Sequence, residues 1–268
     1  KGNAIFIRYK DTRYILAKLS SRYFKKKPNN IIAVTGTNGK TSVSDFFYQI
    51  FLLQNKKSGF IGTLGTRKNK SLKKRGLTTL DPFMLNKDLD TMKRNGIDNV
   101  IIEASSHGLK QKRLNFLKIK TGIFTNLSHD HLDYHKNMND YLNSKLILFR
   151  KIIKKKGTII TDTDINQFES LKKIQKKRKL NILTIGSKGN KFKIINHKIF
   201  ENFQVLKIIF NKKIYKLKVK LYGSIQIKNL LMSILAANTC GLKIPEIFKT
   251  IEKIKSVEGR LELVRNLP

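Results

Sequence analysis

A glycine-rich turn near the start of the sequence contains residue types that bind nucleotide phosphates. The run VTGTNGKTS begins at Val34, after an apolar stretch and before a segment with helical spacing. Gly36 and Gly39 allow a tight turn whose backbone N–H groups can point at phosphate oxygens. Lys40 could reach the β- and γ-phosphates, and Thr41 could offer its hydroxyl to Mg²⁺. The common phosphate-loop pattern has glycine where Val34 stands, so Gly36 must supply the turn.

Further candidate residues follow two apolar stretches later in the chain. Glu103 ends the stretch NVIIE, where it could hold Mg²⁺ or could simply be a solvated strand end. The run SHDHLDYH contains three of the five histidines. It matches the H-x-H-x-D-H motif of two-zinc hydrolases at His129, His131 and Asp133, but Tyr134 stands at the last position. A zinc hydrolase would also leave the phosphate loop unexplained.

Lys145 occupies an unusual position on a predicted helix. It follows Leu142 by three residues and precedes Phe149 by four, so it falls on the apolar face. A partly buried lysine has a lowered pKa, because burial disfavours the charged form. A neutral amine can react with CO₂ to give a carbamate, which resembles a carboxylate as a metal ligand. Periodicity alone favours a simpler interpretation, a lysine whose amine reaches out to water.

Short apolar stretches alternate with segments of helical spacing through most of the chain. This alternation predicts an α/β fold with a mostly parallel sheet flanked by helices on both faces. The strands are expected at 31–35, 99–103, 121–125, 157–161 and 181–185, and the helices near 41–54, 83–95, 138–152 and 165–177. Ligands bind beyond the carboxyl ends of parallel strands, so the candidate residues should meet at one edge of the sheet.

The two ends of the sequence have a different pattern. An amphipathic helix is expected over 10–27. Residues 190–223 alternate apolar residues with lysine, which predicts a small antiparallel sheet with one face in water. A helix is expected over 226–241, closed by Gly241, and another begins at Pro245.

The charge of the chain is strongly positive. Its 56 Lys and Arg against 18 Asp and Glu give a net charge of +38 over 268 residues. One interpretation is a protein that binds nucleic acid or an anionic membrane. The other is a coding bias toward Lys, Ile and Asn, which we favour because no basic block is interleaved with aromatic residues. We therefore expect no specific nucleic-acid partner, although the charge should attract a polyanionic substrate.

Other bulk features indicate the compartment. The single Cys240 excludes an internal disulfide framework and is typical of a reducing environment. The apolar runs are too short to span a bilayer, and no signal peptide precedes them. We expect a cytoplasmic monomer without a membrane span.

Seven motifs occur in the order found in the central domain of the Mur ligases, which the sequence resembles over about 30–265. These motifs are VTGTNGKTS, TTLDP, EASSHGLKQKR, FTNLSHDHLDYH, YLNSK, NLLMSILAA and VEGRLE. The resemblance implies an ATP-dependent ligase of peptidoglycan precursor synthesis. It would add a third amino acid to UDP-N-acetylmuramoyl-L-alanyl-D-glutamate through an acyl phosphate. The sequence does not distinguish meso-diaminopimelate from L-lysine, and we favour meso-diaminopimelate only because it is the commoner choice in bacteria.

The resemblance also implies a domain organisation. Residues 1–30 would be a linker at the end of a missing N-terminal domain, and residues 31–265 the central ATP-binding domain. The C-terminal domain that binds the amino acid would be absent. A chain of this extent would be inactive alone.

Roles for individual residues follow from the same resemblance. The ATP contacts would be Gly36, Thr37, Asn38, Gly39, Lys40, Thr41, Ser42, Asn229 and Arg260. The contacts to the UDP-sugar dipeptide would be Thr78, Thr79, Ser105, Gln111 and Arg113. Two Mg²⁺ ions would be held by Thr41 and Glu103, and by His131 and a carbamylated Lys145. Lys40, His131 and Lys145 would be the catalytic residues, which reverses the interpretation of Lys145 from periodicity.

One departure from the family pattern and two alternatives remain. Gln226 stands where the family usually has Asn, which puts one nucleotide contact in doubt. A folylpolyglutamate synthetase shares G-T-N-G-K and D-H-x-D, but its loop usually continues with Gly-Ser, whereas Thr41 and Ser42 follow here. The other alternative is a non-catalytic ATP-binding remnant. An intact set of four residues argues against such decay: Lys40, Glu103, His131 and Lys145.

Overall fold

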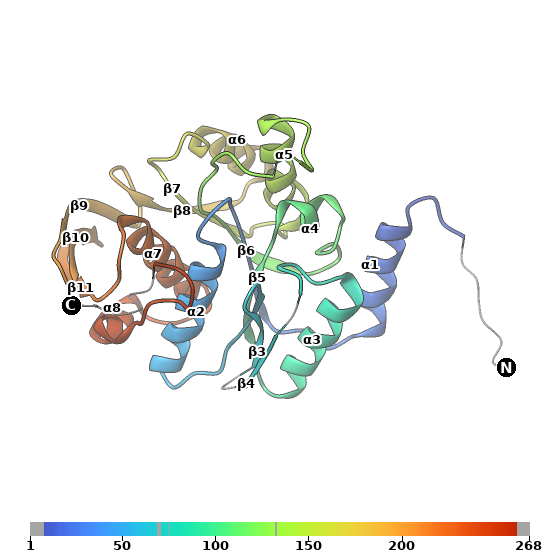
Figure 1. Ribbon diagram of the computed structural model, residues 1–268, viewed down its shortest axis with the longest axis horizontal. Helices are drawn as coiled ribbons and strands as arrows, with labels where there is room; N and C mark the ends of the chain where they lie inside the picture. The colour runs from blue at the N-terminus through green and yellow to red at the C-terminus, as the bar shows by residue number, and fades with distance from the viewer. Residues whose placement is uncertain (1–7, 69–70, 75, 132, 262–268) are drawn as a thin grey trace, which may run out of the picture.

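The computed structural model describes residues 8–68, 71–74, 76–131 and 133–261. The outermost parts of the predicted domain limits, residues 1–7 and 262–265, lie outside the described residues. In the described part, eleven strands form a single sheet with helices on both faces (Figure 1). The prediction of an α/β fold is confirmed.

Six parallel strands form the middle of this sheet. They are β1 (Asn30–Thr35), β2 (Gly59–Gly62), β5 (Asn99–Glu103), β6 (Ile119–Phe124), β7 (Thr158–Asp162) and β8 (Asn181–Gly186). Their spatial order is β8-β7-β6-β1-β5-β2, and all neighbouring pairs are parallel. Five of the six strands were predicted. Because β5 and β6 lie on opposite sides of β1, the sheet has its topological switch point there, where ligands of such folds bind.

The two faces of the sheet carry separate cores. Successive residues of a strand point to opposite faces, and in β1 Ile31 and Ala33 join one core while Ile32 and Val34 join the other. The first core is covered by α3 (Pro82–Arg94), α5 (Met138–Ile147) and α6 (Phe168–Arg178). The second is covered by α2 (Lys40–Leu53), α7 (Ser224–Thr239) and α8 (Ile244–Thr250). Burial on both faces explains why the central strands are almost continuously apolar.

Local signals set the starts of several helices. Asp81 caps α3, because its carboxylate accepts hydrogen bonds from the backbone N–H groups of Phe83 and Met84, and Pro82 occupies the first turn. The N-cap of α2 is Gly39, with a left-handed φ of 89°. Helices α2 and α3 each begin and end one residue before the predicted limits, 41–54 and 83–95.

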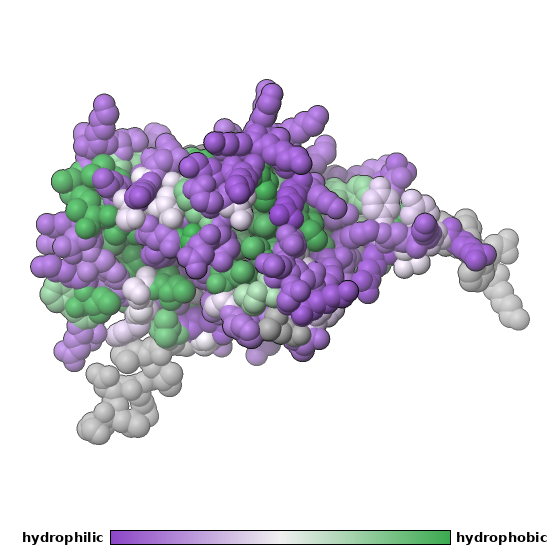
Figure 2. Space-filling view, turned by 90° about the horizontal axis from the view of Figure 1, so that it is seen from above, coloured by the Kyte–Doolittle hydropathy of each residue, from purple (hydrophilic) through white to green (hydrophobic). Residues whose placement is uncertain are grey.

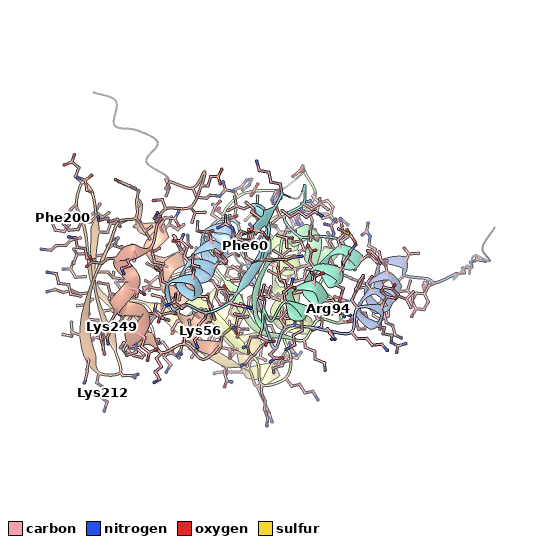
Figure 3. All side chains as sticks on the ribbon, turned by 90° about the horizontal axis from the view of Figure 1, so that it is seen from below. Lys56, Phe60, Arg94, Phe200, Lys212 and Lys249 are labelled. Atoms are coloured by element: carbon pink, nitrogen blue, oxygen red, sulfur yellow. The ribbon has the colours of Figure 1, made fainter. Side chains whose placement is uncertain are left out.

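The three strands near the C-terminal end are antiparallel, as predicted for 190–223. They are β9 (Phe192–Ile199), β10 (Gln204–Phe210) and β11 (Lys213–Val219). They are not a separate sheet, because β9 pairs in parallel with β8 at Ile185 and Gly186 and so extends the main sheet. Figure 3 shows Phe200 and Lys212 at opposite ends of these strands. Buried and accessible residues alternate along β10, which confirms the two-faced pattern.

Some elements were not predicted from the sequence. Two short strands, β3 (Gly65–Lys68) and β4 (Ser71–Lys73), extend the other edge of the sheet from β2 in antiparallel fashion. A short helix, α4 (Ser106–Lys110), follows β5. The predicted helix 138–152 changes to a π-helix, η1 (Leu148–Ile152), after α5. Arg178 donates hydrogen bonds of 2.8 Å to the carbonyls of Phe149 and Ile153, and so satisfies acceptors at this wider turn.

The remaining helices lie at the two ends of the described chain. Helix α1 (Thr12–Tyr23) packs outside α3, with Phe24 and Phe83 in edge contact at 5.1 Å between ring centroids (Figure 1). A 3₁₀ turn, η2 (Ile251–Lys253), follows α8. The interpretation of residues 1–30 as a linker stays a prediction.

Hydrophilic side chains cover much of the face shown in Figure 2, with smaller apolar areas between them. Within the described ranges, no helix is both long and apolar enough to cross a membrane.

Candidate active site

The phosphate loop lies between β1 and α2 and has a backbone that only glycine fits. Gly36 has a φ of 149°, and a Cβ there would lie 1.8 Å from Oγ1 of Thr125. A Cβ at Gly39 would lie 2.5 Å from Oδ1 of Asn229. The missing glycine at Val34 has a simple explanation, since Val34 is a buried residue of β1 and the turn begins later. The predicted strand–loop–helix context is therefore present.

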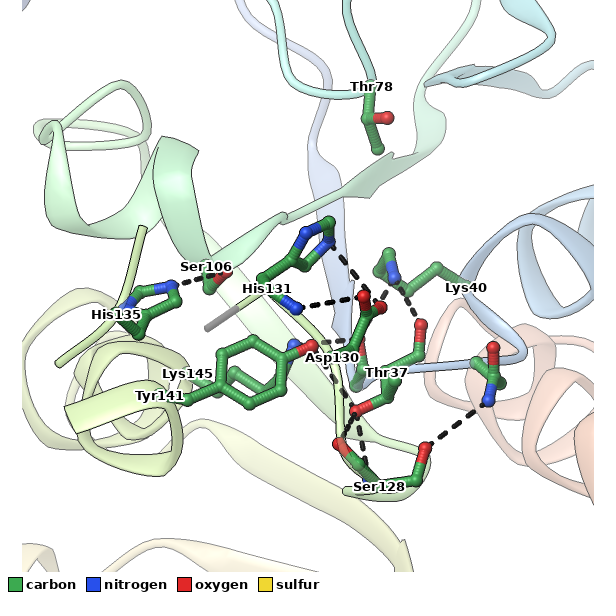
Figure 4. Close-up of polar contacts among 12 residues, drawn as sticks. Thr37, Lys40, Thr78, Ser106, Ser128, Asp130, His131, His135, Tyr141 and Lys145 are labelled. Carbon is green, nitrogen blue, oxygen red and sulfur yellow. Dashed lines mark hydrogen bonds and ion pairs between the residues drawn. The ribbon is translucent and has the colours of Figure 1, made fainter. Parts of the chain in front are cut away.

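A second loop, residues 125–128 after β6, holds the phosphate loop in place (Figure 4). The backbone N–H groups of Thr37 and Asn38 each donate a 3.0 Å hydrogen bond to Asn126, at its carbonyl and side-chain oxygens respectively. The hydroxyl of Thr125 donates to the carbonyl of Asn38 at 2.6 Å. The two loops come from neighbouring strands and are ordered together.

Lys40 is the first residue of α2, and its side chain is partly buried against this loop. Its Nζ donates hydrogen bonds to the carbonyls of Gly36 at 2.9 Å and Thr37 at 2.7 Å. Burial lowers the pKa of Lys40, while the negative charges of Glu103 and Asp130 oppose the shift. The ammonium group is thus held where it can meet a phosphate.

Glu103 is fully buried at the carboxyl end of β5, beside Val34 of β1. Its carboxylate accepts hydrogen bonds from the hydroxyl of Thr41 at 3.1 Å and from both the backbone N–H and the hydroxyl of Thr63 at 3.0 Å. Burial raises the pKa of Glu103, and Lys40 and these hydrogen bonds oppose the shift. The alternative of a solvated strand-end glutamate is wrong.

Thr63 was missed by the sequence reasoning. It lies at the turn between β2 and β3, and it lines the same cavity as the phosphate loop. The available signal was the run GFIGTLG, in which closely spaced glycines mark a tight turn after an apolar stretch. A Cβ at Gly62 would lie 2.1 Å from Oε1 of Glu103, so this glycine allows the close approach.

Lys145 is 1% exposed, on the inner side of α5. Its Nζ donates a 2.8 Å hydrogen bond to the carbonyl of Gly36 and lies 4.1 Å from the ring centroid of Tyr141. Burial, with a contribution from Lys40, lowers the pKa of Lys145 to about 6, against an opposing effect of Asp130. The interpretation of this lysine as reaching out to water is wrong, and its amine is mostly neutral at pH 7.

His131 is exposed, unlike Glu103 and Lys145. It has a left-handed φ of 53°, and its Nε2 lies 3.6 Å from Oδ2 of Asp130 (Figure 4). Among the described residues, no group of three or more His, Cys, Asp and Glu side chains is arranged to hold a metal ion. The zinc-hydrolase alternative requires such a group around His129 and Asp133.

A cavity of about 600 Å³ joins most of the candidate residues. The predicted site residues that line it are Thr37, Asn38, Gly39, Lys40, Thr41, Ser42, Thr78, Ser105, His131, Lys145, Asn229 and Arg260. Gly36 and Glu103 lie directly behind this wall, through their hydrogen bonds to Lys40 and Thr41. The structure therefore brings together residues from positions 36 to 260.

Three predicted substrate contacts lie next to the cavity and not among its lining residues. Thr79 is buried, and its hydroxyl donates to the carbonyl of Glu103 at 2.7 Å. Arg113 donates to the side-chain oxygen of Gln111 at 2.6 Å and also to the carbonyl of Thr79. These three residues support the cavity wall at Ser105, whose N–H donates to Thr79 at 2.9 Å.

Gln226, the departure from the family pattern, takes part in the site. Its Oε1 accepts a 3.0 Å hydrogen bond from Asn229, and its Nε2 donates to the carbonyl of Arg260 at 3.2 Å. Gln226 also lines the cavity, so the glutamine replaces the expected asparagine while keeping polar contact with both predicted ATP residues.

The donor atoms present fit Mg²⁺. The hydroxyl oxygen of Thr41 and Oε2 of Glu103 are 3.1 Å apart. Neighbouring ligands of an octahedral Mg²⁺, each about 2.1 Å from the ion, are about 3 Å apart, so these two oxygens have a suitable spacing once the hydroxyl hydrogen turns away from the carboxylate. The neutral amine of Lys145 has the chemistry needed for a carbamate, and His131 lines the same cavity.

Comparisons with known proteins show which family this chain is similar to. The family described as Mur ligase middle domain matches residues 34–237. A UDP-N-acetylmuramoyl-L-alanyl-D-glutamate--2,6-diaminopimelate ligase of Rickettsia bellii is 36% identical over 269 residues, covering 98% of this chain and 56% of the relative. A solved structure of a ligase of the same name has a TM-score of 0.87 at 27% identity, covering 97% of this chain and 54% of that one.

The folylpolyglutamate synthetase alternative corresponds to a likeness in fold alone. A solved FPGS–AMPPCP complex has a TM-score of 0.75 but only 14% identity, covering 96% of this chain and 71% of that one. The chain spans about half the length of the curated relatives it matches. The family match covers most of the chain and includes the phosphate loop, Glu103 and Lys145, so the chain belongs to the Mur ligase family, as its middle domain.

Proposed function

We propose that the complete protein carrying this chain is an ATP-dependent ligase that joins meso-diaminopimelate to UDP-N-acetylmuramoyl-L-alanyl-D-glutamate. One observation carries the proposal: the phosphate loop and the buried amine of Lys145 line one cavity, and the buried carboxylate of Glu103 lies directly behind its wall at Thr41. The names of the Rickettsia relatives support the choice of diaminopimelate over L-lysine.

The phosphate loop and Lys40 would bind the triphosphate of ATP. The amine of Lys40 donates hydrogen bonds to the carbonyls of Gly36 and Thr37. When ATP binds, it would donate to the phosphate oxygens instead. Asn229 and Arg260, from the C-terminal part of the sequence, line the same cavity and would contact the rest of the nucleotide. Such positioning and charge neutralisation supply most of the catalysis in phosphoryl transfer.

Thr41 and Glu103 would hold one Mg²⁺, and His131 with a carbamylated Lys145 a second. Bound Mg²⁺ neutralises charge on the crowded phosphate and carboxylate oxygens. Lys145 would supply the carbamate because its amine is buried and largely neutral at pH 7. The hydrogen bonds from Thr63 would keep the carboxylate of Glu103 aimed at Thr41.

The substrate carboxylate would enter from the side of Thr78 and Ser105. Both residues line the cavity, and Thr79, Gln111 and Arg113 support its wall at Ser105. The side-chain carboxylate of D-glutamate would attack the γ-phosphorus, giving an acyl phosphate and ADP. The amine of diaminopimelate would then attack the acyl carbon, lose a proton and release phosphate as the amide forms.

The cellular setting follows from this reaction. The substrates are cytoplasmic precursors of the cell wall, so we infer a cytoplasmic enzyme that acts as a monomer, without a specific nucleic-acid partner. The positive charge of the chain would assist the approach of two polyanions, ATP and the UDP-sugar dipeptide.

Product formation tests the proposal directly. The complete protein is incubated with ATP, Mg²⁺, the UDP-sugar dipeptide and either diaminopimelate, L-lysine, or a folate with glutamate, and products are identified by mass spectrometry. We expect the diaminopimelate product together with phosphate release, and Lys40→Ala should abolish both. Product from L-lysine alone would correct the amino acid, and product from the folate pair alone would refute the reaction class.

A further inference from the structure

A buried histidine near the cavity has no part in the proposed function. Four of the five histidines lie between His107 and His135, and only His131 has a proposed role. His135 is 1% exposed, yet both of its ring nitrogens face polar partners. A buried polar side chain with partners on both sides holds a defined orientation.

The two partners of the imidazole belong to different helices. Nε2 of His135 lies 3.0 Å from the hydroxyl of Ser106, the first residue of α4. Nδ1 lies 3.4 Å from Oδ2 of Asp140, in the first turn of α5. A carboxylate can only accept, so the ring proton is on Nδ1, and Nε2 accepts the hydroxyl proton of Ser106. Burial lowers the pKa of His135, against the effect of Asp140, which favours the neutral ring.

A neighbouring lysine fixes the far end of these hydrogen bonds. Lys110 donates a 2.8 Å hydrogen bond to the same oxygen of Asp140. The hydroxyl of Ser144 donates to the carbonyl of Asp140 at 2.8 Å, so it is satisfied without the imidazole, whose Nδ1 is 3.5 Å away. The imidazole can turn only by breaking its contacts to Ser106 and Asp140.

These hydrogen bonds connect two sides of the cavity, and Figure 4 shows the one between His135 and Ser106. Ser106 lines the cavity and follows Ser105, a proposed substrate contact. On the other side, the ring of Tyr141 lies 5.0 Å from that of His135, and its hydroxyl is 3.3 Å from the hydroxyl of Thr37. Helix α5 also carries Lys145, whose amine lies over the ring of Tyr141.

We propose that His135 is a positioning residue. It links the cavity-lining Ser106 to helix α5, and so fixes the position of the proposed substrate contacts relative to Lys145. The inference rests on the proposed function, because it assigns the substrate carboxylate to the wall at Ser105 and Ser106. Loss of this link should misalign the carboxylate and the γ-phosphate, and leave nucleotide binding intact.

Steady-state kinetics of the complete protein test this role. Ser106→Ala removes one hydroxyl, and His135→Gln keeps an acceptor but loses the donor to Asp140. We expect each to lower kcat about tenfold or more, with a change in KM for ATP of less than about threefold. If Ser106 and His135 act through the same hydrogen bonds, kcat of the double variant should be no lower than that of His135→Gln alone. Independent effects on kcat would multiply.

Ser144→Ala is the matched control. It removes a buried hydroxyl beside the ring of His135, and Ser144 does not line the cavity. Its kcat should stay within about twofold of the wild type, whatever its melting temperature. On the 268-residue chain, ¹⁵N NMR should show the His135 proton on Nδ1, and Ser106→Ala should shift the Nε2 resonance.

Each outcome has a defined meaning. Wild-type kcat in both Ser106→Ala and His135→Gln, multiplicative effects in the double variant, or a ring proton on Nε2 would overturn this inference alone. A wild-type protein that forms no amide product would overturn the proposed function, and this inference with it.

Discussion

At the scale of single residues, the site is built from ionisable groups that burial holds away from their ordinary pKa values. Burial raises the pKa of Glu103 and lowers those of Lys40 and Lys145. Lys40 and Glu103 stabilise each other's charged forms, whereas Lys40 adds to the shift of Lys145. Two amines in one loop region can coexist because one of them is neutral.

Lys145→Ala should abolish ligation in the complete protein. The proposed carbamate supplies a carboxylate-like group, so added short-chain carboxylic acids should partly restore turnover by occupying the space left by the side chain. Amide formation is measured with and without acetate, and Lys151→Ala, at an exposed lysine, is the control. Unchanged turnover in Lys145→Ala would contradict the carbamate role.

Lys145→Met should stabilise the chain while removing its activity, because it replaces a buried amine with an apolar side chain of similar length. The pKa of Lys145 falls from 10.5 to about 6 on folding, so the unfolded chain binds the extra proton between these values. The free energy of unfolding of the wild type should therefore rise with pH in this window, by up to about 1.4 kcal/mol per unit. Urea unfolding at several pH values should show that Lys145→Met raises the free energy of unfolding most at and below about pH 6. A stabilisation by Lys145→Met that increased toward pH 10 would contradict the lowered pKa of Lys145.

Thr63→Val should weaken the response to Mg²⁺. The variant keeps the backbone hydrogen bond to Glu103 but loses the 3.0 Å hydroxyl bond that orients the carboxylate. Loss of such a supporting bond typically costs about 10- to 100-fold in metal affinity or activity. The Mg²⁺ concentration for half-maximal nucleotide binding should rise accordingly, and Thr63→Ser should restore it. Thr66→Val is the control, since its buried hydroxyl donates to Asp88 instead; an equal effect there would indicate a general loss of stability.

At the scale of elements, the site depends on three loops that follow β1, β5 and β6. Neighbouring parallel strands end at the same edge, so the phosphate loop, Glu103 and Thr125 are brought together by strand order. The hairpin β2–β3 adds Thr63 from the far side of β5. Helix α5 then covers the phosphate loop with Lys145. Each loop is short and held at both ends, which gives the site its defined geometry.

Gly36→Ala should abolish nucleotide binding and lower stability. The added Cβ would lie 1.8 Å from Oγ1 of Thr125, and the φ of 149° is unfavourable for alanine. Such backbone strain costs about 1–3 kcal/mol before the clash is counted. Thermal unfolding with and without Mg²⁺ and AMPPNP measures both effects. Gly76→Ala is the control, because nothing lies within 4 Å of its Cβ position; normal nucleotide binding in Gly36→Ala would refute the phosphate-loop assignment.

At the scale of the whole molecule, the net charge of +38 is the dominant feature. Few acidic residues are available to pair with so many cations, so most of the positive charge repels itself across the surface. Self-repulsion of this kind destabilises a compact state and is screened by salt. The same field should concentrate polyanions near the cavity.

The chain should therefore become more stable with added NaCl. Between about 20 mM and about 300 mM salt, the Debye length falls severalfold, and repulsion between surface lysines weakens. The melting temperature should rise by several degrees over this range, while the association rate for ATP falls. Sucrose at matched osmolality controls for solvent effects without charge, and a melting temperature that fell with salt would show that attractive pairs dominate instead.

The sequence by itself determined most of the secondary elements and named most of the candidate residues that line the cavity. The continuous apolar runs at 31–35 and 99–103 depend only on local order, and so does the glycine-rich turn at Gly36 and Gly39. The resemblance to the Mur ligases rested on contiguous motifs, which local order also preserves. The hairpin after β2 was missed because its strands are only four residues long or shorter and carry few apolar residues to form a pattern.

Only the tertiary structure decided what these residues do to one another. Lys145 has the spacing of an apolar face, but its burial and lowered pKa depend on Gly36, 109 positions away. Glu103 is buried because Thr63, 40 positions away, satisfies its carboxylate. Ser106 and His135 become partners only when α4 packs on α5. Burial and pKa are set by contacts distant in sequence, and one-dimensional spacing does not contain those contacts.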